Sequence, residues 1–191
     1  MSGMCVVDAA AKEAAVARFL LRHGRMTDLT SDHPALLGCI EVDWSGIPGC
    51  PAGMPALLHG LLDEAAGPDA VRALENVLLD GVFHTSAVMP SALPFLIRLA
   101  AVPDLATRPA LIDLLVLAAE LSRSVDSADE RQVLLFGADH DHPERAACRS
   151  AFSSHAAALR ALVEDEGPPH GLVNADDRAC LLAVLEPSGQ H

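Results

Sequence analysis

The chain is organised around residues 74–98, which read LENVLLDGVFHTSAVMPSALPFLIR. Apolar residues at intervals of three and four, the period of one helical face, lead into it and fill its first half: Val71, Leu74, Leu78 and Val82. A polar corner, His84-Thr85-Ser86, follows, and a second apolar segment leaves that corner. We expect a helix over residues 68–83, the corner, and a helix over residues 93–101. If this unit repeats, it builds a helical solenoid with His84 at one edge.

The same spacing continues on both sides of this unit. It predicts helices over residues 8–23, from Met54 to a stop at Gly67-Pro68, and over residues 108–122, 144–164 and 176–185. Shorter helices are expected near residues 32–37 and 129–136, within otherwise irregular stretches. These helices, about 7–9 in number, fit a repeat architecture better than a four-helix bundle.

The composition favours packed helices. Of the 191 residues, 51% are apolar, but they are mostly Ala, Leu and Val, with five Phe, one Trp and no Tyr. Ala and Leu form helices readily, whereas sheets rely on aromatic and β-branched residues. We therefore expect an all-α fold, a right-handed α-solenoid of antiparallel helix pairs. Its predicted parts are an N-terminal helical appendage (1–40), the solenoid (41–186) and a flexible tail (187–191).

The charge balance restricts the partners. Thirteen basic groups face 26 acidic ones, a formal net charge of −13. Nucleic-acid binding needs a basic stripe to displace counterions, so it is not expected. An acidic surface suits plain solubility, a basic protein partner or a cationic small molecule.

The cysteines and the N-terminus indicate a compartment. Five scattered cysteines without CxxC spacing are expected to be reduced thiols. No basic region followed by an apolar run opens the chain, and no stretch approaches the roughly 18 uninterrupted apolar residues of a membrane span. We expect a cytoplasmic protein without a membrane partner, and the oligomeric state stays open.

Four segments carry a family resemblance: Asp43-Trp44-Ser45, MPALLHGL at 54–61, Val82-Phe83-His84 and ALPFL at 92–96. Over residues 41–185 the chain resembles the HEAT-repeat proteins of high-GC bacteria. The family's Tyr-Gly is replaced by Gly49-Cys50, and its Gln-Gly after the corner His by Thr85-Ser86. The resemblance implies an α-solenoid, in most members an interaction scaffold, and fold alone does not set function.

His84 has two interpretations. It either interacts with the carbonyls at the end of its helix, or acts as a general acid/base, because the ordinary pKa of histidine lies near neutral pH. Asp80, four residues earlier on the same expected helix, could pair with it. The residues expected to bind a ligand beside it are Thr85, Ser86 and Glu75.

Trp44 and its neighbour Asp43 form the second candidate. A lone Trp is either a packing anchor between the appendage and the solenoid or part of a small-molecule pocket. In the second case Asp43 joins His84 and Asp80 as a catalytic candidate.

The densest polar cluster is Asp139-His140-Asp141-His142. It either supplies ligands to a divalent metal, with Asp139, His140 and His142 as candidates, or forms a solvated loop that caps the next helix. No complete metal set, P-loop, GxGxxG or GxSxG motif is found, so no metal and no cofactor is predicted.

Two functions follow from these patterns. The first is a HEAT-like scaffold that binds a basic protein partner through an acidic concave face, in an immunity or regulatory role. The alternative is a small-molecule enzyme of a specialised biosynthetic pathway, with His84 as general acid/base in a pocket near Trp44.

Overall fold

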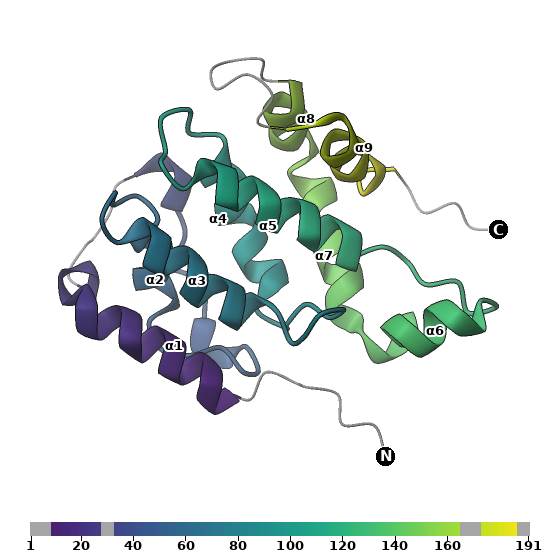
Figure 1. Cartoon of the computed structure of the whole chain (residues 1–191), viewed down its shortest axis with the longest axis horizontal. Coiled ribbons are helices and arrows are strands. Elements are labelled where there is room, and N and C mark those ends of the chain that lie inside the picture. Colours follow the sequence, from purple (N-terminus) through teal and green to yellow (C-terminus); the bar gives the residue numbers. More distant parts are fainter. Residues whose placement is uncertain (1–8, 28–32, 165–172, 187–191) are drawn as a thin grey trace.

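The computed structural model describes residues 9–27, 33–164 and 173–186, and these form helices joined by short loops (Figure 1). Within these ranges there are nine α-helices and no strand, which confirms the all-α class. The α-helices are α1 (Ala9–Arg22), α2 (Met54–Gly60), α3 (Gly67–Leu78), α4 (Met89–Ala100), α5 (Arg108–Leu121), α6 (Glu130–Phe136), α7 (Pro143–Ser154), α8 (Ala156–Glu164) and α9 (Ala175–Ala183). Short 3₁₀ turns are η1 (Gly24–Thr27), η2 (Pro34–Leu36), η3 (Trp44–Gly46) and η4 (Asp139–Asp141).

Prolines explain where many of these helices begin. Five helices, α2, α3, α4, α5 and α7, carry a proline in their first two positions. At that point the missing N–H costs nothing and the fixed φ suits a helix. Pro94 differs, because it lies inside α4.

The helices pack around α4, which contacts η2, α5, α7 and α8. A row of helices runs beside it: α1 packs on α3, α3 on α5, and α5 on α9, and Figure 1 shows α1, α3 and α5 running side by side. One hydrophobic core extends through the fold, from Val16 and Phe19 in α1 to Leu181 in α9. The predicted appendage thus contributes to the same core as the rest of the chain.

The expected helix over residues 68–83 is too long, because α3 ends at Leu78. Gly81 has a φ of 145°, a conformation that favours glycine, and the chain turns back in a tight loop, residues 79–86. The Asp80 N–H donates to the His84 carbonyl at 2.9 Å, and the Ser86 N–H donates to the Leu78 carbonyl at 2.8 Å. Val82, expected to be buried, is 80% exposed as a result.

Three other boundaries differ from the sequence prediction. Gly67-Pro68 begins α3, while α2 already ends at Gly60. The second helix of the central unit begins at Met89, and the single helix expected over 144–164 breaks at His155 into α7 and α8. The short helix near 129–136 is confirmed as α6, that near 32–37 is a single 3₁₀ turn, and the tail 187–191 lies outside the described residues.

The contact between α1 and α2 gives a test of this packing. A Cβ at buried Gly60 would lie 2.5 Å from Cζ of Phe19 and 3.2 Å from Cβ of Ala70. We expect Gly60→Ala to lower the free energy of unfolding by about 1–3 kcal/mol, the usual cost of overpacking, measured by urea denaturation. Gly24→Ala is the matched control, since nothing lies within 4 Å of a Cβ there. Equal stability of the two variants would contradict the packing of Phe19 on α2.

Candidate functional site

The loop of residues 79–86 packs against the segment that joins α6 to α7. The ring of His84 stacks on that of His142, with centroids 4.6 Å apart and planes inclined by 12°. Beside them Phe83 meets Phe136, the last residue of α6, edge to face at 5.4 Å. The structure therefore brings together two clusters that the sequence presents separately, the His84 corner and Asp139–His142.

His84 is buried, with 8% of its surface exposed, and its Nδ1 has no hydrogen-bond partner among the described residues. Burial lowers the pKa of its imidazole, and the nearby His142 and Arg145 lower it further. The negative charges of Glu144 and Asp80 raise the pKa of His84, but by less. We infer that His84 is neutral at pH 7.

His142 is held from two sides. Its Nδ1 lies 2.9 Å from Oε1 of Glu144 in the first turn of α7. Its Nε2 faces Gly137, where an added Cβ would lie 2.5 Å from that nitrogen. Gly137 also has a φ of 71°, so both its conformation and its close approach require glycine.

Thr85 and Ser86 point into the fold. Ser86 Oγ accepts a hydrogen bond from the Val88 N–H at 3.2 Å, where the chain enters α4. Thr85 Oγ1 is buried without a hydrogen-bond partner of ordinary geometry in the described part of the chain. It lies near Cys148, whose thiol pKa burial raises to about 12, against a smaller lowering by the Ser122 and Thr85 hydroxyls. Cys148 is thus a protonated core thiol rather than a nucleophile.

Asp80 does not share a helical face with His84. Its carboxylate forms an ion pair with Lys12, which is 4% exposed, and so ties the loop to α1. Glu75 is exposed on α3, where its carbonyl accepts the N–H of Leu79. The Asp80 carboxylate acts on His84 only as a nearby negative charge.

Asp139 binds two arginines of α7. Its Oδ1 lies 3.3 Å from Arg145 Nη1, and its Oδ2 lies 3.2 Å from Arg149 Nη2. Oδ1 also accepts the Val125 N–H at 3.3 Å. His140 is exposed and faces Asp141 at 3.5 Å. Within the described residues no three His, Cys, Asp or Glu side chains converge as metal ligands.

Asp43 and Trp44 lie in η3. Asp43 caps this turn, accepting the Gly46 N–H at 3.1 Å and the Ser45 hydroxyl at 2.7 Å, and these bonds, led by that of Ser45, lower the pKa of its carboxyl. Trp44 is buried against Phe95 of α4, with ring centroids 6.0 Å apart, and its Nε1–H donates to the Cys39 carbonyl at 2.8 Å. The indole therefore has a packing contact and a satisfied N–H, as expected of an anchor.

Three cations that organise this region were not singled out from the sequence: Lys12, Arg145 and Arg149. Arg145 is 2% exposed and donates to the carbonyls of Phe136 and, at 3.1 Å, Gly137. Arg149 donates to the Ser122 carbonyl at 2.6 Å. The only signals for them were that Lys12 is the single lysine and that the arginines lie one helical turn apart.

Comparison of the chain with protein-family models, curated proteins and solved structures finds no match. The HEAT-repeat resemblance therefore stays a prediction. None of the helices in the described ranges has the length and apolar character needed to cross a membrane.

The buried His84 predicts a pH-dependent stability. Its pKa is lowered from the ordinary value of 6.5, so the unfolded chain takes up a proton before the folded one. The free energy of unfolding should thus be fully retained above pH 6.5 and fall as the pH drops below it. Urea denaturation between pH 7.5 and 5.5 measures this slope.

The variant His84→Gln should have a shallower slope than the unmodified chain. A residual slope is expected, because burial also lowers the pKa of His59. His140→Gln, whose side chain is 83% exposed, is the control and should leave the slope unchanged. An identical slope in His84→Gln would show that His84 is not the group responsible.

Proposed function

We propose that this protein is a helical scaffold that binds a basic protein partner, and that it docks the partner on the surface formed by the loop 79–86 and α6. One observation carries the proposal: four large apolar side chains are exposed on these two neighbouring segments. They are Val82 (80% exposed), Phe83 (42%), Leu134 (85%) and Leu135 (41%), and we call them the apolar patch. The Phe83–Phe136 contact joins the two segments.

The helix α6 has no packing role that would account for its leucines. None of its residues is buried, and Figure 1 shows it at the periphery of the molecule, beyond the end of α5. Several large apolar side chains exposed on two neighbouring segments are typical of protein-binding sites. Burying these side chains against a partner would supply the driving force for association.

The patch is also held in place before any partner binds. Arg145 and Arg149 reach from α7 to carbonyls at both ends of the segment that contains α6. Asp129 caps the helix, accepting the N–H groups of Arg131 and Gln132 at 3.0 and 3.1 Å. A surface that is already ordered loses less entropy on binding, which favours affinity.

The charges around the patch favour a basic partner. Acidic side chains lie before, at the start of and after α6: Asp126 and Asp129, Glu130, and Asp141. Arg131 is the one lysine or arginine between Asp126 and Asp141. Negative charge at the rim of an apolar contact selects positively charged partners and speeds their encounter. The basic partner expected from the sequence would therefore bind at this acidic surface.

We also propose that the helices form a right-handed, HEAT-like solenoid of antiparallel helix pairs. Contacts within the consecutive pairs α2/α3, α4/α5 and α8/α9, and the row from α1 through α3 and α5 to α9, support it. An immunity or regulatory role in the cytoplasm fits such a scaffold, and the described cysteines, Cys39, Cys50, Cys148 and Cys180, are free thiols.

A small-molecule enzyme that uses His84 as general acid/base is the second candidate. Its support is the buried Nδ1 of His84, which has no partner in the described part of the chain, and the Glu144-bound His142 stacked on the ring. The contacts of Trp44, however, are with Phe95 and Cys39, and a pocket shared with His84 needs a rearrangement of the core. The scaffold is therefore the preferred proposal.

The docking surface predicts a selective loss of binding. The immobilised chain is used to capture a partner from native extract, and affinity for the purified partner is then measured by calorimetry. Val82→Asp combined with Leu134→Asp should weaken it at least tenfold, because charges replace apolar contacts, while the melting temperature stays unchanged. Binding should also weaken as salt is added.

Leu21→Asp is the matched control, since Leu21 is 87% exposed on α1, outside the patch. It should bind as the unmodified chain does. Equal binding by the patch variant, or a captured partner that is acidic and insensitive to salt, would rule out this docking surface.

A further inference from the structure

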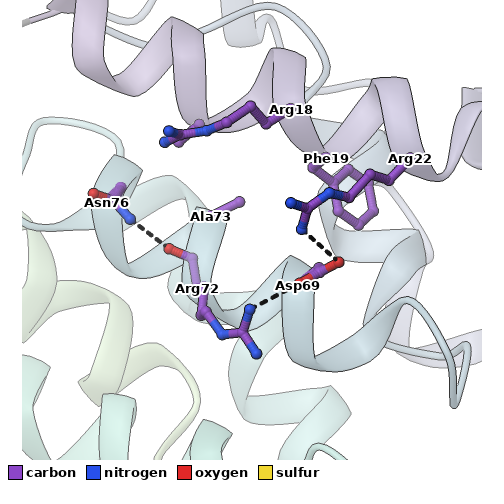
Figure 2. A pocket seen from close by; sticks show the side chains of 8 residues that line it. Arg18, Phe19, Arg22, Asp69, Arg72, Ala73 and Asn76 are labelled. Carbon is purple, nitrogen blue, oxygen red and sulfur yellow. Dashed lines mark hydrogen bonds and ion pairs between the residues drawn. The ribbon is translucent and has the colours of Figure 1, made fainter.

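A groove between α1 and α3 lies outside the regions discussed so far. It encloses about 260 Å³ and is lined by residues one helical turn apart on each helix (Figure 2). They are Ala15, Arg18, Phe19 and Arg22 of α1, and Asp69, Arg72, Ala73 and Asn76 of α3. This spacing places all eight on the facing sides of the two helices.

The groove is cationic, although the chain is strongly acidic. It holds three guanidinium groups and one carboxylate, which leaves two positive charges, in a chain with 13 basic and 26 acidic groups. Figure 2 shows Arg18 and Arg22 on α1 and Arg72 on α3, with Arg22 and Arg72 each joined to Asp69. A local excess of positive charge of this kind attracts anions.

Neutralising Asp69 does not account for three arginines. Asp69 Oδ2 lies 3.4 Å from Arg22 Nη1 and 3.0 Å from His23 Nε2, and its Oδ1 lies 2.9 Å from Arg72 Nη1. A guanidinium has five N–H donors, so Arg22 and Arg72 each keep most of theirs free of Asp69. Arg18 makes no ion pair or hydrogen bond within the described residues, and Figure 2 draws none.

We propose that this groove binds a phosphate group, as free phosphate or as the head of a small phosphate monoester. Planar guanidiniums recognise phosphate through paired N–H donors, and three of them line this groove. The volume is below that of drug-sized ligand pockets, which suits a small anion. Ala15, Phe19 and Ala73 supply an apolar wall against which the carbon part of an ester packs.

Isothermal titration calorimetry with inorganic phosphate and with phenyl phosphate, at low salt and pH 7.5, tests the proposal on the intact chain. Both probes compete for the same groove, and tighter binding of phenyl phosphate identifies an ester as the ligand, whereas equal affinity identifies free phosphate. Arg18→Gln should weaken binding roughly tenfold, and Arg18→Gln/Arg22→Gln/Arg72→Gln should abolish it. The three side chains are exposed, so the melting temperature should change little.

Two further variants make the test specific. Arg160→Gln removes the same charge from an exposed arginine of α8 and should leave phosphate affinity unchanged. Asp69→Asn should strengthen phosphate binding, since it removes a repelling carboxylate and releases Arg22 and Arg72. No binding of either probe to the unmodified chain, or equal binding by the triple variant, would overturn the proposal.

Discussion

Burial of α4 is the constraint on which the other elements depend. Eight of its 12 residues are buried, and η2, α5, α7 and α8 all pack on it. All eight buried side chains are apolar, so the contacts of α4 with its neighbours are made by hydrophobic packing. α3 packs on α5 and ends at the loop 79–86, while α7 contains Arg145 and follows directly after His142. The stacking of His84 on His142 is therefore a consequence of how two helices pack against a third.

Charge is distributed unevenly between the interior and the surface. Three cations are almost fully buried, Lys12, Arg108 and Arg145, and two of them bind main-chain carbonyls: Arg108 that of Ala100, and Arg145 those of Phe136 and Gly137. In the described part of the chain no Asp or Glu is buried, so the surface there is more acidic than the composition alone suggests. The arginines of the α1/α3 groove are an exception, and they lie on different helices from the acidic rim of α6.

The sequence predicted the helices well, because the period of apolar residues and the positions of prolines can both be read from neighbouring residues. The end of α3 was missed because Val82 continues the apolar period of Leu74 and Leu78. The helix nevertheless ends at Leu78, since Leu79 is already extended, and the chain turns back through Gly81. Of the candidate site, His84 and the Asp139–His142 cluster were both noticed in the sequence. Their contact was not, since it depends on packing between segments distant in the chain. The cationic groove could not be predicted for the same reason. The spacing of the arginines on each helix can be read from the sequence, but the packing of α1 on α3 depends on the tertiary structure.

The attachment of α6 has a consequence for how this protein can diversify. Arg145 and Arg149 hold its segment mainly through backbone carbonyls, which every amino acid provides. The exposed side chains of α6 therefore contribute little to the stability of the fold. Related chains can replace them without loss of the scaffold, and a new recognition specificity can arise by changing one short helix while the remainder of the molecule stays as it is.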